Sequence, residues 1–295
     1  GIPMERAVGI FGGDDRHCYL ANDLISRGYE VLVWELGNER RACPMLPEFD
    51  KIKIAKSFSE LAKDCQILAG PLPFSKYLAV KSHKGCENFG DTLCAHVREG
   101  QHFFAGGIPK DLAEQLRKKG VRVTDYLEDE FFLKENGQLT AQGCVAEVIG
   151  AWKKGIRHAK VLVTGFGFCG REIAKVMRGV GADVTVCVRR MQSAWQAYEE
   201  GFAIGYYEQL HDLLPRTDIV INTVPVPVLP ESRLRHARAG TVLVEIASAP
   251  GGFLPEAAKD LGLTVLLCPG LPGKYAPAGA ARVMADCMEN RKCGE

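Results

Sequence analysis

Residues 160–170 have the sequence K-V-L-V-T-G-F-G-F-C-G, in which an apolar run leads into three glycines spaced G-x-G-x-x-G. The β-branched run predicts a strand, and the residues after Gly170 predict a helix that ends near Gly179. Between a strand and a helix, such glycines permit a tight turn, let the backbone approach a pyrophosphate and let the helix pack closely on the strand. The phosphates then lie at the helix N-terminus. We therefore expect a dinucleotide site, rather than a plain strand-to-helix turn, at Gly165, Phe166, Gly167, Phe168, Cys169 and Gly170.

The end of the next expected strand, 183–188, indicates which dinucleotide is bound. Sites for NAD place an acidic residue after this strand, where it accepts a hydrogen bond from the ribose 2′-hydroxyl. This chain has Arg189 and Arg190 there instead. Two guanidinium groups suit a 2′-phosphate through charge-assisted hydrogen bonds, so the pattern favours NADP as the cofactor. A solvated pair of surface arginines is the alternative.

Outside this motif, expected strands and helices alternate along the whole chain, which is typical of parallel sheets covered on both faces. Strands are expected at 7–11, 30–34, 51–54, 66–69, 102–105 and 122–124, and again at 161–164, 183–188, 202–205, 218–222, 241–246 and 264–267. The expected helices include one near 91–98, one that begins at Pro109 and a longer one over 142–154. The sequence thus predicts an α/β fold with two Rossmann-like, doubly wound parallel-sheet domains and a cleft between them.

This pattern also predicts the domain boundaries. Residues 1–138 form the expected N-terminal α/β domain, on the substrate side, and residues 139–274 form the expected Rossmann domain for NADP. A last helix, near 278–289, has no strand to follow it. We expect the C-terminal segment 275–295 to join the first domain.

Composition narrows the range of partners. The 295 residues are 46% hydrophobic, and 37 Lys and Arg nearly balance 36 Asp and Glu. The charge balance does not favour binding to nucleic acid or to an anionic membrane surface, and no apolar run is long enough to cross a bilayer. Because Gly1–Met4 do not resemble a signal peptide, we expect a cytoplasmic protein whose partners are small molecules or another protein.

Eleven cysteines are scattered through the chain without a Cys-x-x-Cys pair, and we expect most of them, Cys18 among them, to be small buried residues. One cluster contains His83, Cys86, Cys94 and His96. Its spacing matches no zinc pattern, so we expect no metal there.

Three loops at strand ends of the second domain are expected to line the cofactor site, because ligands of doubly wound sheets gather beyond the carboxyl ends of the strands. Their small residues permit close approach of the ribose and the nicotinamide, and two of the loops carry hydroxyls. Loops that only connect elements are the alternative. The expected contacts are Thr223, Val224, Pro225, Ala247, Ser248, Pro269 and Gly270.

The substrate is expected at strand-end loops of the first domain. Residues 12–16 precede a predicted helix, whose N-terminus favours an anion, so we expect Asp14 and Arg16 to contact a carboxylate substrate. Ser75, after another strand, is expected in the same cleft. Lys274 is either a second anion contact or a surface lysine. The sequence pairs no histidine with a carboxylate in a way that identifies a general base, so no catalytic residue is assigned.

These strand-end loops resemble those of the A-type subunit of dipicolinate synthase from spore-forming bacteria. The similarity lies in Gly12-Gly13-Asp14-x-Arg16, in residues 221–225, in Ala247-Ser248 with Pro250-Gly251-Gly252, and above all in Pro269-Gly270-Leu271-Pro272-Gly273 with Ala276-Pro277. The resemblance implies a two-domain NADP-binding protein that oxidises dihydrodipicolinate to dipicolinate, during sporulation, together with a flavoprotein-like B-type subunit. The chain departs from the family pattern at Phe168-Cys169, where Arg-Thr is expected, and at Ala278-Gly279, where Lys-Thr is usual.

The residues and the resemblance agree on the class of chemistry. Aromatising a dihydropyridine dicarboxylate removes a hydride and a proton, so the protein must hold two carboxylates and aim a ring carbon at the nicotinamide. Arg16 and Lys274 are the expected anchors. Two alternatives stay open, a 2-hydroxyacid or amino-acid dehydrogenase and a nonenzymatic NADP-binding partner protein. A homodimer is also compatible with this architecture.

Overall fold

The structure, a computed structural model, describes residues 6–36 and 46–293, so the Gly1–Met4 segment lies outside the described residues. The chain divides into two compact units, one of Gly1–Leu133 with Pro277–Glu295 and one of Lys134–Ala276. Within the two described ranges, no helix combines the length and the hydropathy that a membrane crossing requires. Each unit contains one six-stranded parallel sheet, which confirms the predicted α/β fold class.

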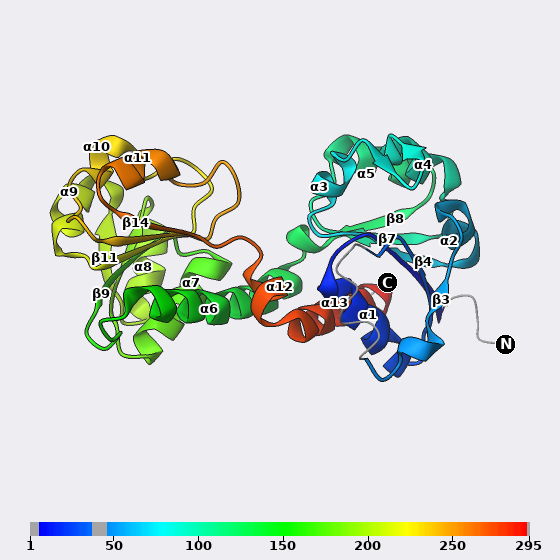
Figure 1. The fold of residues 1–295 in the computed structure, drawn as a ribbon, viewed down its shortest axis with the longest axis horizontal. Helices are drawn as coiled ribbons and strands as arrows, with labels where there is room; N and C mark the ends of the chain where they lie inside the picture. Colours follow the sequence, from blue (N-terminus) through cyan, green and yellow to red (C-terminus); the bar gives the residue numbers. More distant parts are fainter. Residues whose placement is uncertain (1–5, 37–45, 294–295) are drawn as a thin grey trace. The chain divides into compact units, whose positions relative to one another are not determined.

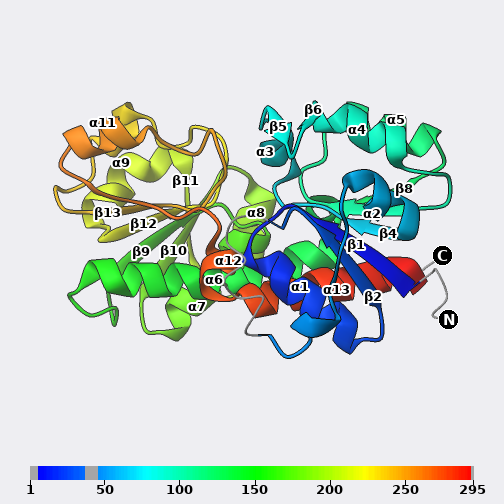
Figure 2. The same cartoon turned by 45° about the vertical axis from the view of Figure 1, so that its right-hand side comes forward.

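The first unit has the strand order β3-β2-β1-β4-β7-β8 (Figures 1 and 2). Its strands are β1 (Ala7–Phe11), β2 (Glu30–Trp34), β3 (Lys53–Ile54), β4 (Ile67–Ala69), β7 (His102–Ala105) and β8 (Arg122–Asp125). One face is covered by α2 (Phe58–Asp64), α4 (Phe89–His96) and α5 (Lys110–Lys118), and the other by α1 (Asp15–Ser26) and α13 (Pro277–Cys293). The strand order reverses between β1 and β4, and ligands of such sheets bind beyond the carboxyl ends of the strands at this point.

Ion pairs tie α13 to α1, although the two helices lie at opposite ends of the sequence. The guanidinium of Arg27, just after α1, lies 2.7 Å from Asp286 and 3.5 Å from Glu289 of α13. It also lies 3.1 Å from Asp23 of its own helix. The last helix of the chain therefore forms one layer with the first.

The second unit has the strand order β11-β10-β9-β12-β13-β14, with every neighbouring pair parallel. Its strands are β9 (Lys160–Thr164), β10 (Asp183–Val188), β11 (Ala203–Tyr206), β12 (Ile219–Asn222), β13 (Val242–Glu245) and β14 (Thr264–Leu267). Successive strand residues point to opposite faces. Accordingly Val163 packs toward α6 (Glu130–Trp152), α7 (Phe168–Gly179) and α8 (Met191–Glu199), while Leu162 packs toward α9 (Leu210–Leu213), α10 (Glu231–Leu234) and α11 (Pro255–Asp260).

The main difference from the expected elements is α6, which begins at Glu130 rather than near residue 142. Asp129 caps it, because the N–H of Phe132 donates to Asp129 Oδ1 at 2.9 Å. Gly137 interrupts the helical pattern of the sequence, yet a Cβ there would lie 2.9 Å from the Phe168 carbonyl oxygen. This glycine permits a close approach and does not end the helix.

Several short elements were not expected. They are α3 (Phe74–Leu78), the hairpin of β5 (Ser82–His83) and β6 (Cys86–Glu87), α12 (Leu271–Tyr275), and 3-10 turns at Phe49–Lys51, Tyr126–Glu128, Tyr207–Gln209 and Leu214–Arg216. Among them, α3 and the turn at Tyr207–Gln209 carry residues that line the two cavities of the candidate site.

Candidate functional site

The glycine loop of the second unit has the geometry that a pyrophosphate site requires. Gly165 has φ 94°, a left-handed conformation that favours glycine. A Cβ on Gly170 would lie 2.4 Å from the Gly165 carbonyl oxygen, so this glycine permits the close packing of α7 on the turn. By contrast, a Cβ on Gly167 would meet no protein atom within 4 Å. The space beside the Gly167 backbone, at the start of α7, is therefore open to a ligand.

The two residues inside the motif that depart from the family pattern differ in exposure. Phe168 is exposed, whereas Cys169 is half-buried and packs against the core that includes α6. Burial raises the pKa of the Cys169 thiol, and a hydrogen bond with Thr140 works in the opposite direction. Cys169 is thus a neutral packing residue, because a reactive cysteine needs a lowered pKa.

A cavity of about 490 Å³ opens beside the glycine loop. Its wall contains Gly165, Phe166, Val224 and the two arginines at the end of β10, Arg189 and Arg190. Both arginines are exposed and form no ion pair in the part of the chain that the structure describes. The structure therefore brings the glycine loop and the arginine pair to one cavity.

The residues of this wall that were missed from the sequence include Ser193, Tyr207 and Arg233. Ser193 lies in the first turn of α8, Tyr207 follows β11, and Arg233 lies on α10. None belongs to a motif, although a serine three residues after Arg190 was a usable signal. The cavity also has one carboxylate among its lining residues, that of Glu208.

Buried hydrogen bonds join the carboxyl ends of three adjacent strands. Thr164 Oγ1 donates to Asn222 Oδ1 at 2.7 Å, and Asn222 Nδ2 donates to Glu245 Oε1 at 2.7 Å. The backbone N–H groups of Ala247 and Gly252 also donate to the Glu245 carboxylate, at 3.1 and 2.8 Å. Burial raises the pKa of Glu245, and these donors offset part of that effect. The network fixes the loops after β9, β12 and β13 relative to one another.

The expected cofactor contacts after these strands share this edge of the sheet but differ in availability. Thr223 Oγ1 donates to the Thr164 carbonyl oxygen at 2.6 Å, so its proton is already engaged. Ala247 is half-buried, and its N–H is already engaged by Glu245. Exposed positions are Pro225, Ser248, Pro269 and Gly270. Only Val224 of this set lines the cavity.

Lys274, the second expected anion contact, already has a partner. Its ammonium forms an ion pair with Glu147 of α6, within the same unit. This contact raises the pKa of Lys274 and lowers that of Glu147. A second anion at Lys274 would have to compete with Glu147.

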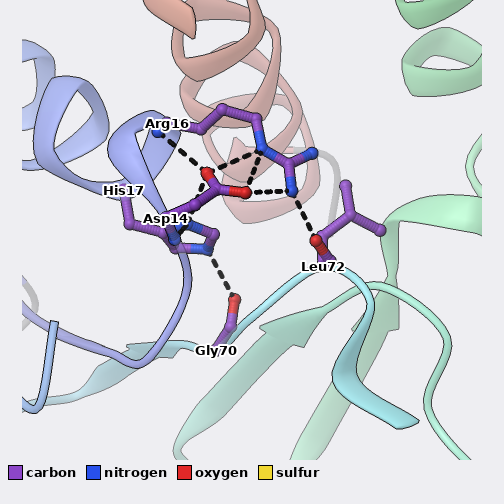
Figure 3. Close-up of polar contacts among 5 residues, drawn as sticks. All are labelled: Asp14, Arg16, His17, Gly70 and Leu72. Carbon is purple, nitrogen blue, oxygen red and sulfur yellow. Dashed lines mark hydrogen bonds and ion pairs between the residues drawn. The ribbon is translucent and has the colours of Figure 1, made fainter. Parts of the chain in front are cut away.

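In the first unit, Asp14 and Arg16 pair with each other (Figure 3). Asp14 caps α1 by accepting from the Arg16 N–H at 2.9 Å, and its carboxylate also accepts from Arg16 Nε at 2.9 Å and Nη2 at 2.8 Å. Burial alone would raise the pKa of Asp14, but the neighbouring His17 ring together with the hydrogen bonds and charge of Arg16 outweigh burial and hold this pKa well below its usual range. Arg16 Nη2 donates to the Leu72 carbonyl oxygen as well. Arg16 is thus largely committed to fixing two loops, with Nη1 as its remaining donor group.

Two histidines of the first unit are held at both ring nitrogens. His17 Nδ1 accepts from the Asp14 N–H at 3.3 Å, so Nε2 carries the proton and donates to the Gly70 carbonyl oxygen at 3.2 Å (Figure 3). His83 Nδ1 lies 2.9 Å from Glu35 Oε1, and its Nε2 lies 2.6 Å from the Tyr77 carbonyl oxygen. No sequence pattern indicated the pairing of His83 with Glu35, because the two residues are far apart along the chain. Neither ring has a free nitrogen to act as a base.

A second cavity, of about 420 Å³, lies at the carboxyl end of the first sheet. It is lined by Gly13, Asp14, Lys76, Tyr77, Val80 and the segment 71–73. Neither Arg16 nor Ser75 lines it, and the exposed Ser75 side chain lies outside this wall. Lys76, which was missed from the sequence, is its lining cation. A signal existed, because Lys76 lies in the first turn after the Pro71–Pro73 loop.

Metal and disulfide chemistry contribute little to these cavities. Among residues 6–36 and 46–293, no group of three or more His, Cys, Asp or Glu side chains could hold a metal ion. Cys18 is buried, as expected, and it is disulfide-bonded. Buried free thiols are found at Cys65, Cys144, Cys187, Cys268 and Cys287.

Comparison with known proteins assigns each unit to a family. Residues 7–127 match the family model of the N-terminal domain of the dipicolinate synthase A-type subunit, and residues 134–262 match that of the alanine dehydrogenase/PNT C-terminal domain. The second unit is therefore a dehydrogenase-like domain of the type that binds a nicotinamide dinucleotide.

Similar proteins agree with this assignment. The dipicolinate synthase A-type subunit of Bacillus subtilis (strain 168) is 29% identical over 179 residues, which cover 61% of this chain and 59% of that protein's length. Alanine dehydrogenase of Mycolicibacterium smegmatis is 33% identical over 114 residues, 35% of this chain and 30% of that protein. The solved structure of the dipicolinate synthase A-type subunit from Bacillus halodurans has the same fold, with a TM-score of 0.84 over 99% of each chain at 22% identity. These findings confirm that the chain resembles dipicolinate synthase A-type subunits, with the first unit matching their N-terminal domain.

Proposed function

We propose that this protein oxidises dihydrodipicolinate to dipicolinate with NADP, together with a flavoprotein-like B-type subunit. The product and the existence of another subunit are inferred from the names of the relatives. The observation that carries the choice of NADP is the 490 Å³ cavity, whose wall contains the exposed Arg189 and Arg190 together with Gly165 and Phe166 of the glycine loop. A ribose phosphate would pair with guanidinium groups that the described part of the protein leaves without ion pairs.

The residues of the second unit bind and orient the cofactor, which supplies the hydride acceptor at its nicotinamide ring. The glycine loop and the N-terminus of α7 are the proposed seat of the pyrophosphate, and Val224, which lines the cavity, is a proposed contact for the adenosine half. The Thr164–Asn222–Glu245 network keeps the loops that carry Ala247 and Ser248 in place. Pro225, Pro269 and Gly270 complete the proposed contacts.

In the first unit, we assign Lys76 as the cation that receives a substrate carboxylate. It lines the 420 Å³ cavity with Asp14, whereas Arg16 holds that loop in shape and can offer only Nη1 to a ligand. Ser75 is a further proposed substrate contact in this unit, and Lys274 of the second unit stays a separate proposed anion contact, for which an anion must compete with Glu147. The proton lost on aromatisation needs no strong base, which agrees with histidines whose ring nitrogens are all engaged.

The test is to mix the purified chain with dihydrodipicolinate and either NADP or NAD, with and without the B-type subunit, and to follow the absorbance of dipicolinate. We expect dipicolinate to form with concomitant reduction of NADP. Gly167→Ala is the informative variant, because its Cβ meets no protein atom and should leave thermal unfolding unchanged while blocking the phosphates. A preference for NAD, or a turnover rate that Gly167→Ala leaves unchanged, would contradict the proposal. Equal turnover by the B-type subunit alone would instead make this chain a noncatalytic partner.

A further inference from the structure

We propose that the seat of the ribose 2′-phosphate is formed by Arg189 and Arg233 around the hydroxyl of Tyr207, and not by the neighbouring pair Arg189 and Arg190. The two guanidiniums come from different connections of the sheet, one after β10 and one after β12. The inference rests on the proposed use of NADP and specifies which residues distinguish it from NAD.

Arg233 is held in place before any ligand binds. Its Nη1 donates to the Val228 carbonyl oxygen at 2.9 Å, and its guanidinium carbon lies 5.9 Å from the centroid of the Tyr207 ring. The side chain is half-buried, while Arg189 and Arg190 are exposed. An arginine that is already ordered loses less rotamer entropy on binding an anion than an exposed arginine does. Arg233 is therefore the better placed guanidinium for a strong contact.

Tyr207 shares its cavity wall with positively charged side chains. Tyr207 is 8% exposed and lines the same cavity as the three arginines. Burial raises the pKa of this phenol to about 12, the Cys187 thiol adds to the rise, and Arg189 and Arg233 both act in the opposite direction. The geometry agrees with this effect, because Arg233 lies near the Tyr207 ring and Arg189 lines the same cavity. Arg190 lines the same cavity from the N-cap position of α8, but no contact fixes its side chain in the described part of the chain.

Like charges that converge without a carboxylate partner indicate an anion site. Arg189 and Arg233 form no ion pair within the described ranges, and the one lining carboxylate, Glu208, is exposed. Three guanidiniums against one carboxylate leave the cavity cationic. A phosphate between Arg189 and Arg233 would relieve their repulsion and accept a hydrogen bond from the Tyr207 hydroxyl.

The experiment measures binding of 2′,5′-ADP and of 5′-AMP by calorimetry, because these two ligands differ only in the 2′-phosphate. The variants are Arg233→Met and, as a matched control in the same cavity, Arg190→Met. We expect Arg233→Met to lower the affinity for 2′,5′-ADP by about tenfold or more, which is the range of a charge-assisted contact. The affinity for 5′-AMP should change by less than about twofold. Arg190→Met should lower the affinity for 2′,5′-ADP by no more than about threefold. Tyr207→Phe should lower the affinity for 2′,5′-ADP but leave that for 5′-AMP unchanged.

Three results would overturn the inference. Equal weakening of both ligands by Arg233→Met would mean that Arg233 stacks on the adenine. A larger effect of Arg190→Met would restore the neighbouring pair as the phosphate seat. If Arg233→Met binds 2′,5′-ADP as tightly as wild type, Arg233 does not contact the 2′-phosphate. If Arg233→Met unfolds, Arg233→Lys keeps the charge without the planar fork and should still lose part of the selectivity for 2′,5′-ADP. Wild-type protein that binds both ligands equally would contradict NADP itself, which separates that failure from this one.

Discussion

The substitution Asp14→Asn tests the ion pair at the start of α1. Asparagine keeps an oxygen that accepts from the Arg16 N–H, but it removes the charge that faces the guanidinium. The Arg16 side chain is 11% exposed and that of Asp14 is 38% exposed. Exposed pairs contribute up to about 1 kcal/mol, whereas removing one partner of a fully buried pair costs roughly 3–5 kcal/mol. Because solvent screens Asp14, we expect a loss of about 1–2 kcal/mol at neutral pH.

The pH dependence of this loss is the sharper part of the prediction. The pKa of Asp14 in the folded state lies well below its ordinary value of 3.8. The ion pair therefore contributes fully above pH 3.8, and its contribution is lost as the pH falls toward the folded-state pKa. The difference in unfolding free energy between wild type and Asp14→Asn should be constant near neutral pH and should shrink below about pH 4.

Urea unfolding followed by the fluorescence of Trp34 measures this difference in the first unit. Trp34 is almost fully buried there, and replacing Trp152 and Trp195 of the second unit by phenylalanine removes the competing signal. Asp14→Ala serves as a control, because it also removes the helix cap and should cost about 1 kcal/mol more. If Asp14→Asn is as stable as wild type at neutral pH, or if the difference persists unchanged at pH 3, the reasoning fails.

Three further substitutions have expected outcomes. Gly170→Ala places a methyl group 2.4 Å from a backbone oxygen and should cost roughly 1–3 kcal/mol; an unchanged thermal midpoint would show that the turn can relax. Gly252→Ala places its Cβ 2.2 Å from Asn222 Nδ2, so dinucleotide affinity and stability should fall together, and wild-type affinity would count against the role of the network. Arg27→Met removes three carboxylate contacts and should speed amide hydrogen exchange in α13. The increase in exchange rate should be larger at low salt than at high salt, because salt screens ion pairs. An unaltered exchange rate would show that these ion pairs do not hold α13 to α1.

The strands were predictable because runs of β-branched and aromatic residues are bounded by glycines and prolines in this chain. The strands 7–11, 30–34, 102–105, 183–188 and 264–267 have the expected limits. The start of α6 was not predictable, because Gly137 has the appearance of a helix stop and its reason, the nearby Phe168 carbonyl, comes from a distant segment. Local pattern therefore determined the elements, and tertiary contacts decided their lengths.

For the candidate site, the sequence located charges but not their partners. Arg16 was expected to be free for a substrate, yet its neighbour Asp14 accepts most of its hydrogen bonds. Lys76 and Arg233 belong to no motif, and only the folded chain places them in a cavity wall. The glycine loop and the pair Arg189 and Arg190 were easier to predict, because each is a run of neighbouring residues whose pattern indicates its chemistry. That these residues bind NADP stays a prediction.

The buried network at the second sheet has an evolutionary consequence. Thr164, Asn222 and Glu245 exchange hydrogen bonds across three strands, so replacing one leaves the polar groups of the others without partners. A second replacement then adds little to the damage of the first, and the free-energy changes of single variants do not sum. Across related sequences these three positions should covary as a set, because a drift at one strand end is tolerated only with a compensating change at its neighbours.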